Sequence, residues 1–190
     1  MGEVFRAAAI GADGFRKPVV IKRVLAHAAS QELSDMFVAE AKLMTRLAHP
    51  NIVEVFDFGK SDDGAYYLVM ELVDGLDLRA FADSYCTAPM PISLALYVVR
   101  EALRGLSFAH TQAFGAEALV HRDVSPGNLL LSTLGEVKLA DFGVALVAAP
   151  DAAGDSLIVG KPSYMAPEQA AGDAVDARAD LFSLGVVLYE

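Results

Sequence analysis

The sequence predicts an α+β fold, with a strand-rich part over the first 73 residues followed by a part made mainly of helices. Short apolar runs that end at turn residues, among them Val19–Val24 and Tyr66–Leu72, are typical of strands. The later part contains longer segments in which apolar residues recur at helical spacing. The chain has 190 residues, of which 54% are hydrophobic, enough for one sizeable core or two small lobes.

Composition excludes several classes of function. The formal net charge of −10 argues against a nucleic-acid partner, because phosphate backbones require clustered lysine and arginine. The single cysteine, Cys86, excludes an intramolecular disulfide and is typical of a reducing compartment. Within these residues there is no run of 18 apolar residues, and the first residues lack the pattern of basic, then apolar, then small residues that is typical of a signal peptide. We therefore expect a cytoplasmic protein and leave open a membrane anchor in a C-terminal part outside this sequence.

The first residue with a candidate chemical role is Lys22, in the predicted strand Val19–Val24. Period-two alternation places Lys22 on one face with Val20 and Val24. A lysine between two valines on an inward face needs an anionic partner, whereas on an outward face it is an ordinary surface lysine. The next predicted helix offers such a partner in Glu40. Glu40 lies on the same helical stripe as four apolar residues, Leu33, Phe37, Met44 and Leu47.

Further strands and helices follow along the chain. We expect strands over Ile52–Phe56 and Tyr66–Leu72, a break at residues 73–75, and a short helix over Leu78–Tyr85. Ser93 is the predicted N-cap of a long helix that ends at His110. The apolar stripe of this helix consists of Ala95, Val99, Ala102, Leu106 and Ala109.

The stretch His121–Asn128 is the strongest candidate for a catalytic site. A proline and a glycine make its turn rigid. Two short apolar runs after it are predicted to pair as a hairpin, namely Leu129–Leu131 and Val137–Leu139. Such a hairpin would bring Asp123, Asn128 and Asp141 together at one end. Three oxygen-bearing side chains that converge suit Mg²⁺, which prefers oxygen ligands.

These residues match a known signature. The aspartate and asparagine of His121–Asn128, the triplet at 141–143 and the triplet at 166–168 resemble the HRDxxxxN, DFG and APE motifs of the protein kinase family. The resemblance covers essentially the whole chain and is to the bacterial (Hanks-type) serine/threonine kinases. It implies a two-lobed fold, with residues 1–73 as an N-lobe made of a small antiparallel sheet and one main helix, and residues 74–190 as a mainly helical C-lobe. Compared with the family, we expect the N-lobe to lack its first strand and the start of the glycine-rich loop, and the C-lobe to lack its C-terminal helices.

The resemblance also implies roles for individual residues. Asp123 would accept the proton of the substrate hydroxyl, and Asn128 and Asp141 would hold Mg²⁺. Lys22 would hold the α- and β-phosphates of ATP while Glu40 orients it. The remaining nucleotide contacts would come from Gly2, Val4, Val20, Met70, Glu71, Val73, Asp77 and Leu130. For Asp77, a ribose contact and a helix N-terminal acid are equally good interpretations.

Two residues depart from the family pattern. Ser125 occupies the catalytic-loop position where serine/threonine kinases usually have a lysine, and Lys161 occupies the position of a threonine. Lys161 is expected either to form a salt bridge with Asp123 or to reach a phosphate. Ser156 is a candidate phosphorylation site that Arg122 would recognise, or else an unmodified loop serine.

Together these features predict an ATP-dependent serine/threonine protein kinase that transfers the γ-phosphoryl group of Mg-ATP to protein hydroxyls. The alternative is a catalytically impaired kinase-like fragment or pseudokinase that binds nucleotide or protein. A small-molecule phosphotransferase is disfavoured, because the segment that ends at Glu168 serves protein-substrate docking in the family.

Overall fold

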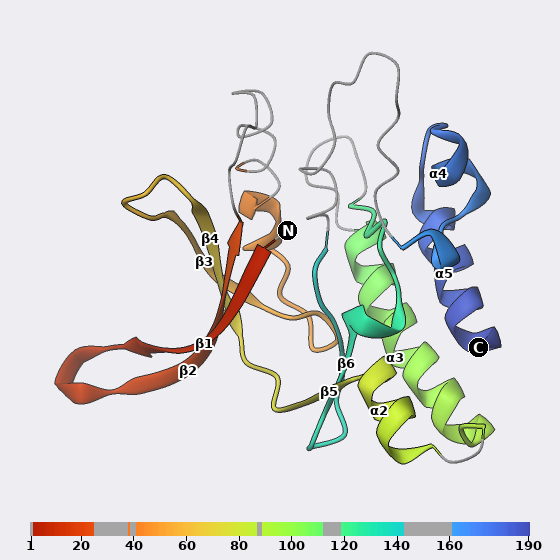
Figure 1. Cartoon of the computed structure of the whole chain (residues 1–190), viewed down its shortest axis with the longest axis horizontal. Helices are drawn as coiled ribbons and strands as arrows, with labels where there is room; N and C mark the ends of the chain where they lie inside the picture. The colour runs from red at the N-terminus through yellow and green to blue at the C-terminus, as the bar shows by residue number, and fades with distance from the viewer. Residues whose placement is uncertain (1, 25–37, 39–40, 87–88, 112–118, 143–160) are drawn as a thin grey trace. The chain divides into compact units, whose positions relative to one another are not determined.

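The structure is a computed structural model that describes residues 2–24, 38, 41–86, 89–111, 119–142 and 161–190 (Figure 1). The chain divides into two compact units. The first unit consists of residues 1–48 and 53–73, and the second of residues 49–52 and 74–190. Residues 49–52 thus belong with the second unit, although the chain on both sides of them belongs to the first.

The first unit is built on a four-stranded antiparallel sheet in the order β1-β2-β4-β3. Strand β1 (Gly2–Ile10) and strand β2 (Arg16–Val24) form a hairpin closed by a 3₁₀ turn at Ala12–Gly14. Strand β4 (Tyr66–Glu71) lies between β2 and β3 (Val55–Lys60). The buried hydrophobic residues of this unit are Val19, Ala41, Met44, Leu47, Val53, Val55, Ala65, Leu68 and Met70.

One predicted strand of this unit was wrong in its limits. The strand expected over Ile52–Phe56 begins only at Val55. Ile52 instead ends a turn, in which its N–H donates to the carbonyl of His49 over 3.0 Å. It forms an isolated parallel bridge with Leu139 of the second unit and is buried there. The apolar character that predicted a strand therefore serves packing in the other unit.

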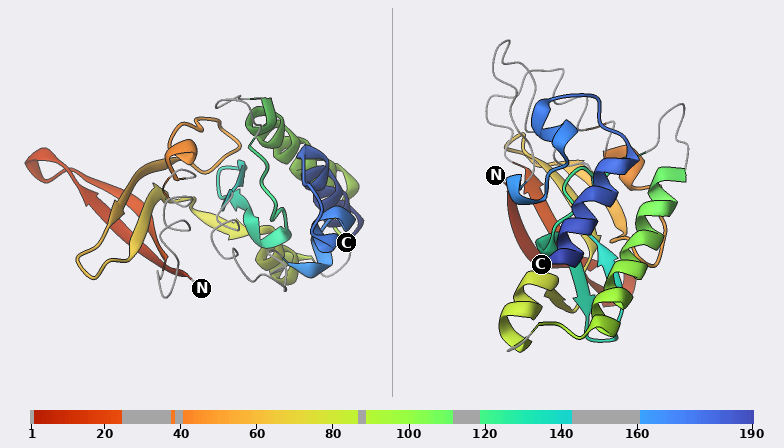
Figure 2. Two further views of the ribbon diagram at one scale, coloured as in Figure 1. Left: turned by 90° about the horizontal axis from the view of Figure 1, so that it is seen from above. Right: turned by 90° about the vertical axis from the view of Figure 1, so that its right-hand side faces the viewer.

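The second unit combines a small sheet with helices. Strands β5 (Gly75–Asp77), β6 (Leu129–Ser132) and β7 (Val137–Leu139) form an antiparallel sheet in that order. Its helices are α2 (Leu78–Tyr85), α3 (Ile92–Thr111), α4 (Pro167–Ala171) and α5 (Ala177–Tyr189), with 3₁₀ turns at Pro126–Asn128 and Pro162–Tyr164. Helices α3 and α5 run side by side (Figure 2). A sheet-based unit followed by a mainly helical one confirms the predicted α+β class.

Helix α3 begins before its predicted cap. The N–H groups of Leu94 and Ala95 both donate to the carbonyl of Pro91, so Ser93 lies inside the first turn and is not the N-cap. The helix buries Val98, Glu101, Ala102, Gly105, Leu106 and Ala109. Of the predicted stripe, Ala102, Leu106 and Ala109 are buried, whereas Ala95 and Val99 are only half-buried.

A buried carboxylate on this helix, Glu101, was not predicted. Asn51 donates to it over 3.1 Å, and Arg100 and Arg104 form ion pairs with it at 2.9 Å. Burial raises the pKa of Glu101, but the hydrogen bonds from these three residues outweigh burial and hold the pKa below its usual value. Glu101 therefore links α3 to the segment at residues 49–52.

Helix α5 begins at Ala177 and is capped by Asp176, whose side chain accepts from the N–H of Arg178. One side of the helix is buried through Ala179, Asp180, Ser183, Leu184 and Val187. Leu181, Phe182, Leu188 and Tyr189 remain exposed. Among the described residues, we find no helix that is both long enough and apolar enough to span a bilayer.

Candidate active site

The buried carboxylate of Asp180, on helix α5, anchors the start of the loop His121–Asn128 by hydrogen bonds to its backbone. Its Oδ2 accepts from the backbone N–H of His121 and its Oδ1 from that of Arg122, both over 2.8 Å. His110 Nε2 lies 2.7 Å from the same Oδ2. Arg122 has φ of 67°, a left-handed conformation that costs a non-glycine residue energy. Asp180 therefore fixes a strained backbone at the start of the loop.

His121 has a structural role in this loop. Its side chain is fully buried, its Nε2 lies 3.0 Å from the carbonyl oxygen of Ala140, and its ring packs 4.4 Å from that of Phe142. In the described part of the chain, no group of three or more His, Cys, Asp or Glu residues is placed to hold a metal ion. His121 thus connects the loop to the chain beside Asp141.

Asp123 and Asn128 are bonded to each other across the turn of the loop. Asn128 Nδ2 donates to the backbone carbonyl of Asp123 over 2.7 Å and to its Oδ2 over 2.8 Å. Since the amide nitrogen is directed at Asp123, the amide oxygen is the atom of Asn128 that remains for a cation. The backbone geometry of Pro126 starts the 3₁₀ turn that makes this contact possible.

The predicted hairpin after the loop is confirmed. Strands β6 and β7 pair antiparallel, with Leu129 opposite Leu139. The N–H of Ala140 donates to the carbonyl of Asn128 over 2.9 Å, which brings Asp141 to the end of the hairpin where Asn128 and Asp123 lie. Asp141 itself has φ of 61°. Asn128 and Asp141 therefore flank the same end of this hairpin, and Asp123 is bonded to Asn128.

Gln169 of helix α4 contacts the loop at 121–128, which the sequence did not predict. Its Nε2 donates to the backbone carbonyl of Arg122 over 2.9 Å, and its Oε1 accepts from the N–H of Ala166 over 3.3 Å. The carbonyl of Arg122 and its N–H are thus both engaged, the first by α4 and the second by α5. A glutamine directly after the triplet at 166–168 is the only sequence signal for this contact.

Lys161 contacts Asp123, but through its backbone N–H and not through the salt bridge that was one of the two expectations. The Lys161 ammonium donates to Ser125 Oγ over 2.8 Å, and it is the backbone N–H of Lys161 that reaches Asp123 Oδ1, over 3.3 Å. Ser125 is fully buried, while Lys161 is exposed. The two residues that depart from the family pattern are therefore bonded to each other.

The expected nucleotide contacts of the first unit lie on its sheet. Lys22 is half-buried in the middle of β2, opposite Val4 on β1 and Leu68 on β4. Met70 is buried, and the side chain of Val4 is 63% exposed. The others are Gly2 at the start of β1, Val20 on β2, Glu71 at the end of β4 and Val73 after it. Glu40 and Ser156 lie outside the described residues, and the roles of all these residues toward nucleotide stay predictions.

Two expected nucleotide contacts belong to the second unit. Asp77 and Leu130 are opposite each other in the β5–β6 pair. Asp77 is the N-cap of α2, and its Oδ1 accepts from the N–H of Ala80 over 2.8 Å. The structure thus shows the helix-capping interpretation of Asp77, and a ribose contact stays a prediction.

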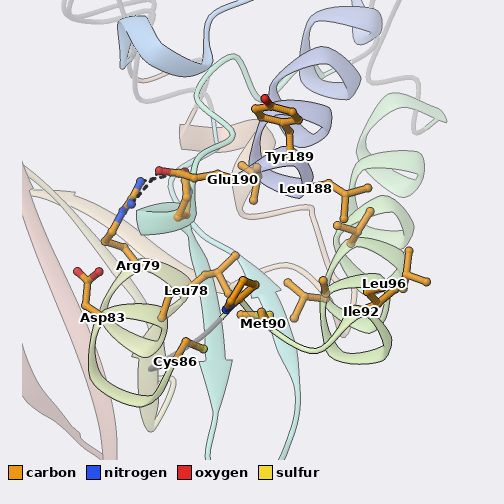
Figure 3. Close-up of a pocket in the computed structure, with 17 residues that line it drawn as sticks. Leu78, Arg79, Asp83, Cys86, Met90, Ile92, Leu96, Leu188, Tyr189 and Glu190 are labelled. Atoms are coloured by element: carbon orange, nitrogen blue, oxygen red, sulfur yellow. Dashed lines mark hydrogen bonds and ion pairs between the residues drawn. The ribbon is translucent and has the colours of Figure 1, made fainter.

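A cavity of about 650 Å³ lies between α2, α3 and the end of α5 (Figure 3). Apolar side chains such as Leu78, Met90 and Leu188 line it, together with an ion pair between Arg79 and Glu190 at 3.0 Å. Tyr164 also donates to Glu190 over 2.5 Å, and this bond and the one from Arg79 lower the pKa of Glu190. Of the loop at 121–128, only Pro126 lines this cavity, so it is separate from the residues expected to carry the chemistry.

Comparison with known proteins gives a consistent result. The family described as "Protein kinase domain" matches residues 1–190. The "Tyrosine-protein kinase MasK" of Myxococcus xanthus is 44% identical over 201 residues, which cover 100% of this chain and 30% of that protein. The "Serine/threonine-protein kinase PknB" of Mycobacterium leprae is 40% identical over 159 residues, 81% of this chain and 24% of that protein. The chain thus spans about a third or less of the length of these relatives.

A solved structure has the same architecture. The PknI kinase domain of Mycobacterium tuberculosis superposes with a TM-score of 0.76 at 34% sequence identity, over 100% of this chain and 66% of that chain. Its identity is high enough for the likeness to concern the family as well as the fold. The expected two-lobed fold, incomplete relative to such a domain, is confirmed.

Proposed function

The chain belongs to the protein kinase family, and on this premise we propose that it transfers the γ-phosphoryl group of ATP to hydroxyl groups of protein substrates. In such a transfer the bond between the γ-phosphorus and the leaving oxygen of ADP breaks, and a bond from the acceptor oxygen to phosphorus forms. The acceptor hydroxyl loses its proton, and Asp123 is the residue that takes it.

The observation that carries this proposal is that Asn128 is bonded both to Asp123 and to Ala140, the residue directly before Asp141. Both oxygens of the Asp123 carboxylate accept hydrogen bonds, from Asn128 Nδ2 and from the N–H of Lys161. The carboxylate is therefore held in one orientation before substrate arrives, and a held base needs little rearrangement in the transition state.

The donor set at the hairpin end fits a divalent cation. Asp141 supplies a carboxylate and Asn128 an amide oxygen, and hard oxygen ligands of this kind suit Mg²⁺. Two protein ligands are few, which agrees with a cation that takes its other oxygens from phosphates and water. When bound, Mg²⁺ would neutralise charge on the phosphates. For Lys22 of the first unit, oriented by Glu40, the proposed role is to hold the α- and β-phosphates of ATP.

We propose serine and threonine as the acceptors. The names of the relatives point in both directions, since PknB is named a serine/threonine kinase and MasK a tyrosine kinase. Pro126 starts the turn of the loop, and a proline at this position resembles the loop of serine/threonine kinases. We also propose that the chain acts in the cytoplasm on proteins and has no nucleic-acid partner, in keeping with its net charge of −10.

The test is the melting temperature of the 190-residue chain against ATP concentration, with and without Mg²⁺, followed by transfer assays on serine, threonine and tyrosine peptides. A ligand that binds only the folded state stabilises by RT ln(1 + [L]/Kd), about 2.7 kcal/mol at a hundredfold excess over Kd. We expect a saturable, Mg²⁺-dependent rise that disappears in Asp141→Ala. Asp123→Asn is the matched control, which should keep the rise and lose transfer.

Other outcomes separate the alternatives. A melt that responds to ATP without any transfer would indicate a kinase-like binding module, and transfer confined to tyrosine would overturn the proposed acceptor. A cooperative melt without any ATP response would overturn the proposal for this chain.

A further inference from the structure

The contact between Lys161 and the loop at 121–128 places a positive charge where the proposed reaction occurs. Lys161 lies at the start of the 3₁₀ turn Pro162–Tyr164, and its side chain crosses the loop to Ser125 Oγ at 2.8 Å. It passes over Gly127, where a Cβ atom would lie only 2.9 Å from Nζ. The glycine therefore leaves the space that the ammonium occupies.

The ammonium is only partly satisfied by this contact. An ammonium has three N–H donors, and Ser125 Oγ, a neutral acceptor, takes one of them. Within the described residues, we find no carboxylate at ion-pair distance from Nζ. The Asp123 carboxylate is engaged by the backbone N–H of Lys161 and by Asn128, not by the ammonium. As far as the described residues show, two donors and the positive charge of Lys161 thus remain for an anion.

Ser125 fixes the position of this charge. Its side chain is fully buried, so its hydroxyl has a defined place in the loop, two positions after Asp123 in the chain. A flexible lysine that bonds to a rigid, buried hydroxyl loses part of its conformational freedom before any ligand binds. This is the arrangement expected of a cation that must be in place when charge develops on a substrate.

We propose that Lys161 is a catalytic residue whose ammonium binds the oxygens of the phosphoryl group during transfer, and that Ser125 is the positioning residue that aims it. This inference rests on the proposed kinase function. Lys161 exchanges no proton in the step: the acceptor proton goes to Asp123, the electron pair of the broken bond goes to ADP, and Lys161 supplies charge only. The charge on the transferred group is largest in the transition state, so the effect falls mainly on kcat.

The alternative is a purely structural role, in which Lys161 only fastens its segment to the loop. A structural role needs a hydrogen-bond donor at this position but no charge. Lys161→Gln keeps a donor and removes the charge, Lys161→Met removes both, and Lys161→Arg keeps the charge in a different geometry. Lys42→Met is the matched control, because Lys42 is an exposed lysine of the first unit.

The experiment measures kcat and KM for a peptide substrate, together with the affinity for ADP alone and for ADP with aluminium fluoride, a mimic of the transferring phosphoryl group. We expect Lys161→Met and Lys161→Gln to lower kcat by about a hundredfold with KM changed less than threefold. The affinity for ADP should stay unchanged while that for ADP with aluminium fluoride falls at least tenfold. Lys161→Arg should retain more activity than Lys161→Gln, and Lys42→Met should match the parent.

Exchanging Lys161 and Ser125 with each other gives a second, independent test of the proposal. Lys161→Ser alone should behave like Lys161→Met, and adding Ser125→Lys to it restores an ammonium and a hydroxyl at the same contact with their positions reversed. We expect the double variant to recover at least tenfold in kcat over the single one.

Three results would overturn the inference. The first is an active parent in which Lys161→Met loses no more activity than Lys42→Met. The second is a Lys161→Gln variant with parental kcat, which would assign Lys161 a structural role. The third is a parent that binds neither ADP nor ADP with aluminium fluoride, in which case the proposed function fails as well. A parent that binds both without transferring still tests Lys161 through the difference between the two affinities.

Discussion

The substitution Asp180→Asn tests how the loop at 121–128 is held. The carboxylate of Asp180 accepts three hydrogen bonds, from the N–H groups of His121 and Arg122 and from His110. An asparagine retains one acceptor oxygen. If that oxygen serves His121 and His110, the amide NH₂ group faces the N–H of Arg122, and two donors then oppose each other.

The magnitude follows from these contacts. Leaving one largely buried N–H without an acceptor costs about 1–3 kcal/mol, and weakening two charge-assisted bonds to neutral ones adds about 1 kcal/mol. We therefore expect Asp180→Asn to destabilise the protein by about 2–4 kcal/mol. With a urea m-value of about 2 kcal/mol/M, the unfolding midpoint would fall by about 1–2 M.

The assay is urea unfolding followed by far-UV circular dichroism, since the sequence contains no tryptophan for fluorescence. Asp176→Asn provides the matched control, because it makes the same chemical change at the exposed N-cap of the same helix. Asparagine caps helices about as well as aspartate, and the exposed ion pair with Arg178 contributes little to stability. Equal midpoints for the two variants would refute the role given to Asp180.

Three further predictions concern helices α3 and α5. Gly105→Ala should destabilise the protein by about 1–3 kcal/mol despite the better helix propensity of alanine, because its Cβ would lie 2.8 Å from the carbonyl oxygen of Asn51. Gly185→Ala in α5, with open space around its Cβ, should instead stabilise by about 0.5–1 kcal/mol, and thermal melts compare the two. Glu101 has a pKa below its usual value of 4.5 in the folded state, so its contribution is present above that pH and is lost as the pH falls through its folded pKa. Glu101→Gln should therefore be less stable than the parent at pH 7, and the difference should shrink below about pH 4.5; a constant difference down to pH 3 would contradict this.

The sequence predicted best what depends on neighbours in the chain. The helix Leu78–Tyr85 and the strand Val137–Leu139 have the limits that were expected, because apolar periodicity and turn residues are local signals. The hairpin that brings Asn128 and Asp141 together followed from the same signals. Likewise, the sequence alone identified Ser125 and Lys161 as the two residues that depart from the family pattern.

What the sequence could not predict depends on contacts between distant segments. Ile52 has the apolar character of a strand residue, and only the position of Leu139 decides that it pairs there. Glu101 looks like a surface residue of α3 until Asn51 is brought against it. The atoms that Lys161 uses likewise depend on where the 3₁₀ turn at Pro162–Tyr164 lies relative to the loop.

The placement of residues 49–52 has a consequence for the order of folding. During synthesis these four residues leave the ribosome well before their partners, since Asn51 donates to the carbonyl of Val137, 86 positions later. The strands of the first unit can pair among themselves as soon as residue 71 is available, whereas the segment at 49–52 must wait for α3 and β7. Such distant contacts close large loops and form slowly. Translation that stalls between residues 71 and 137 would thus leave Ile52 without its apolar cover, and that intermediate is where chaperone binding should concentrate.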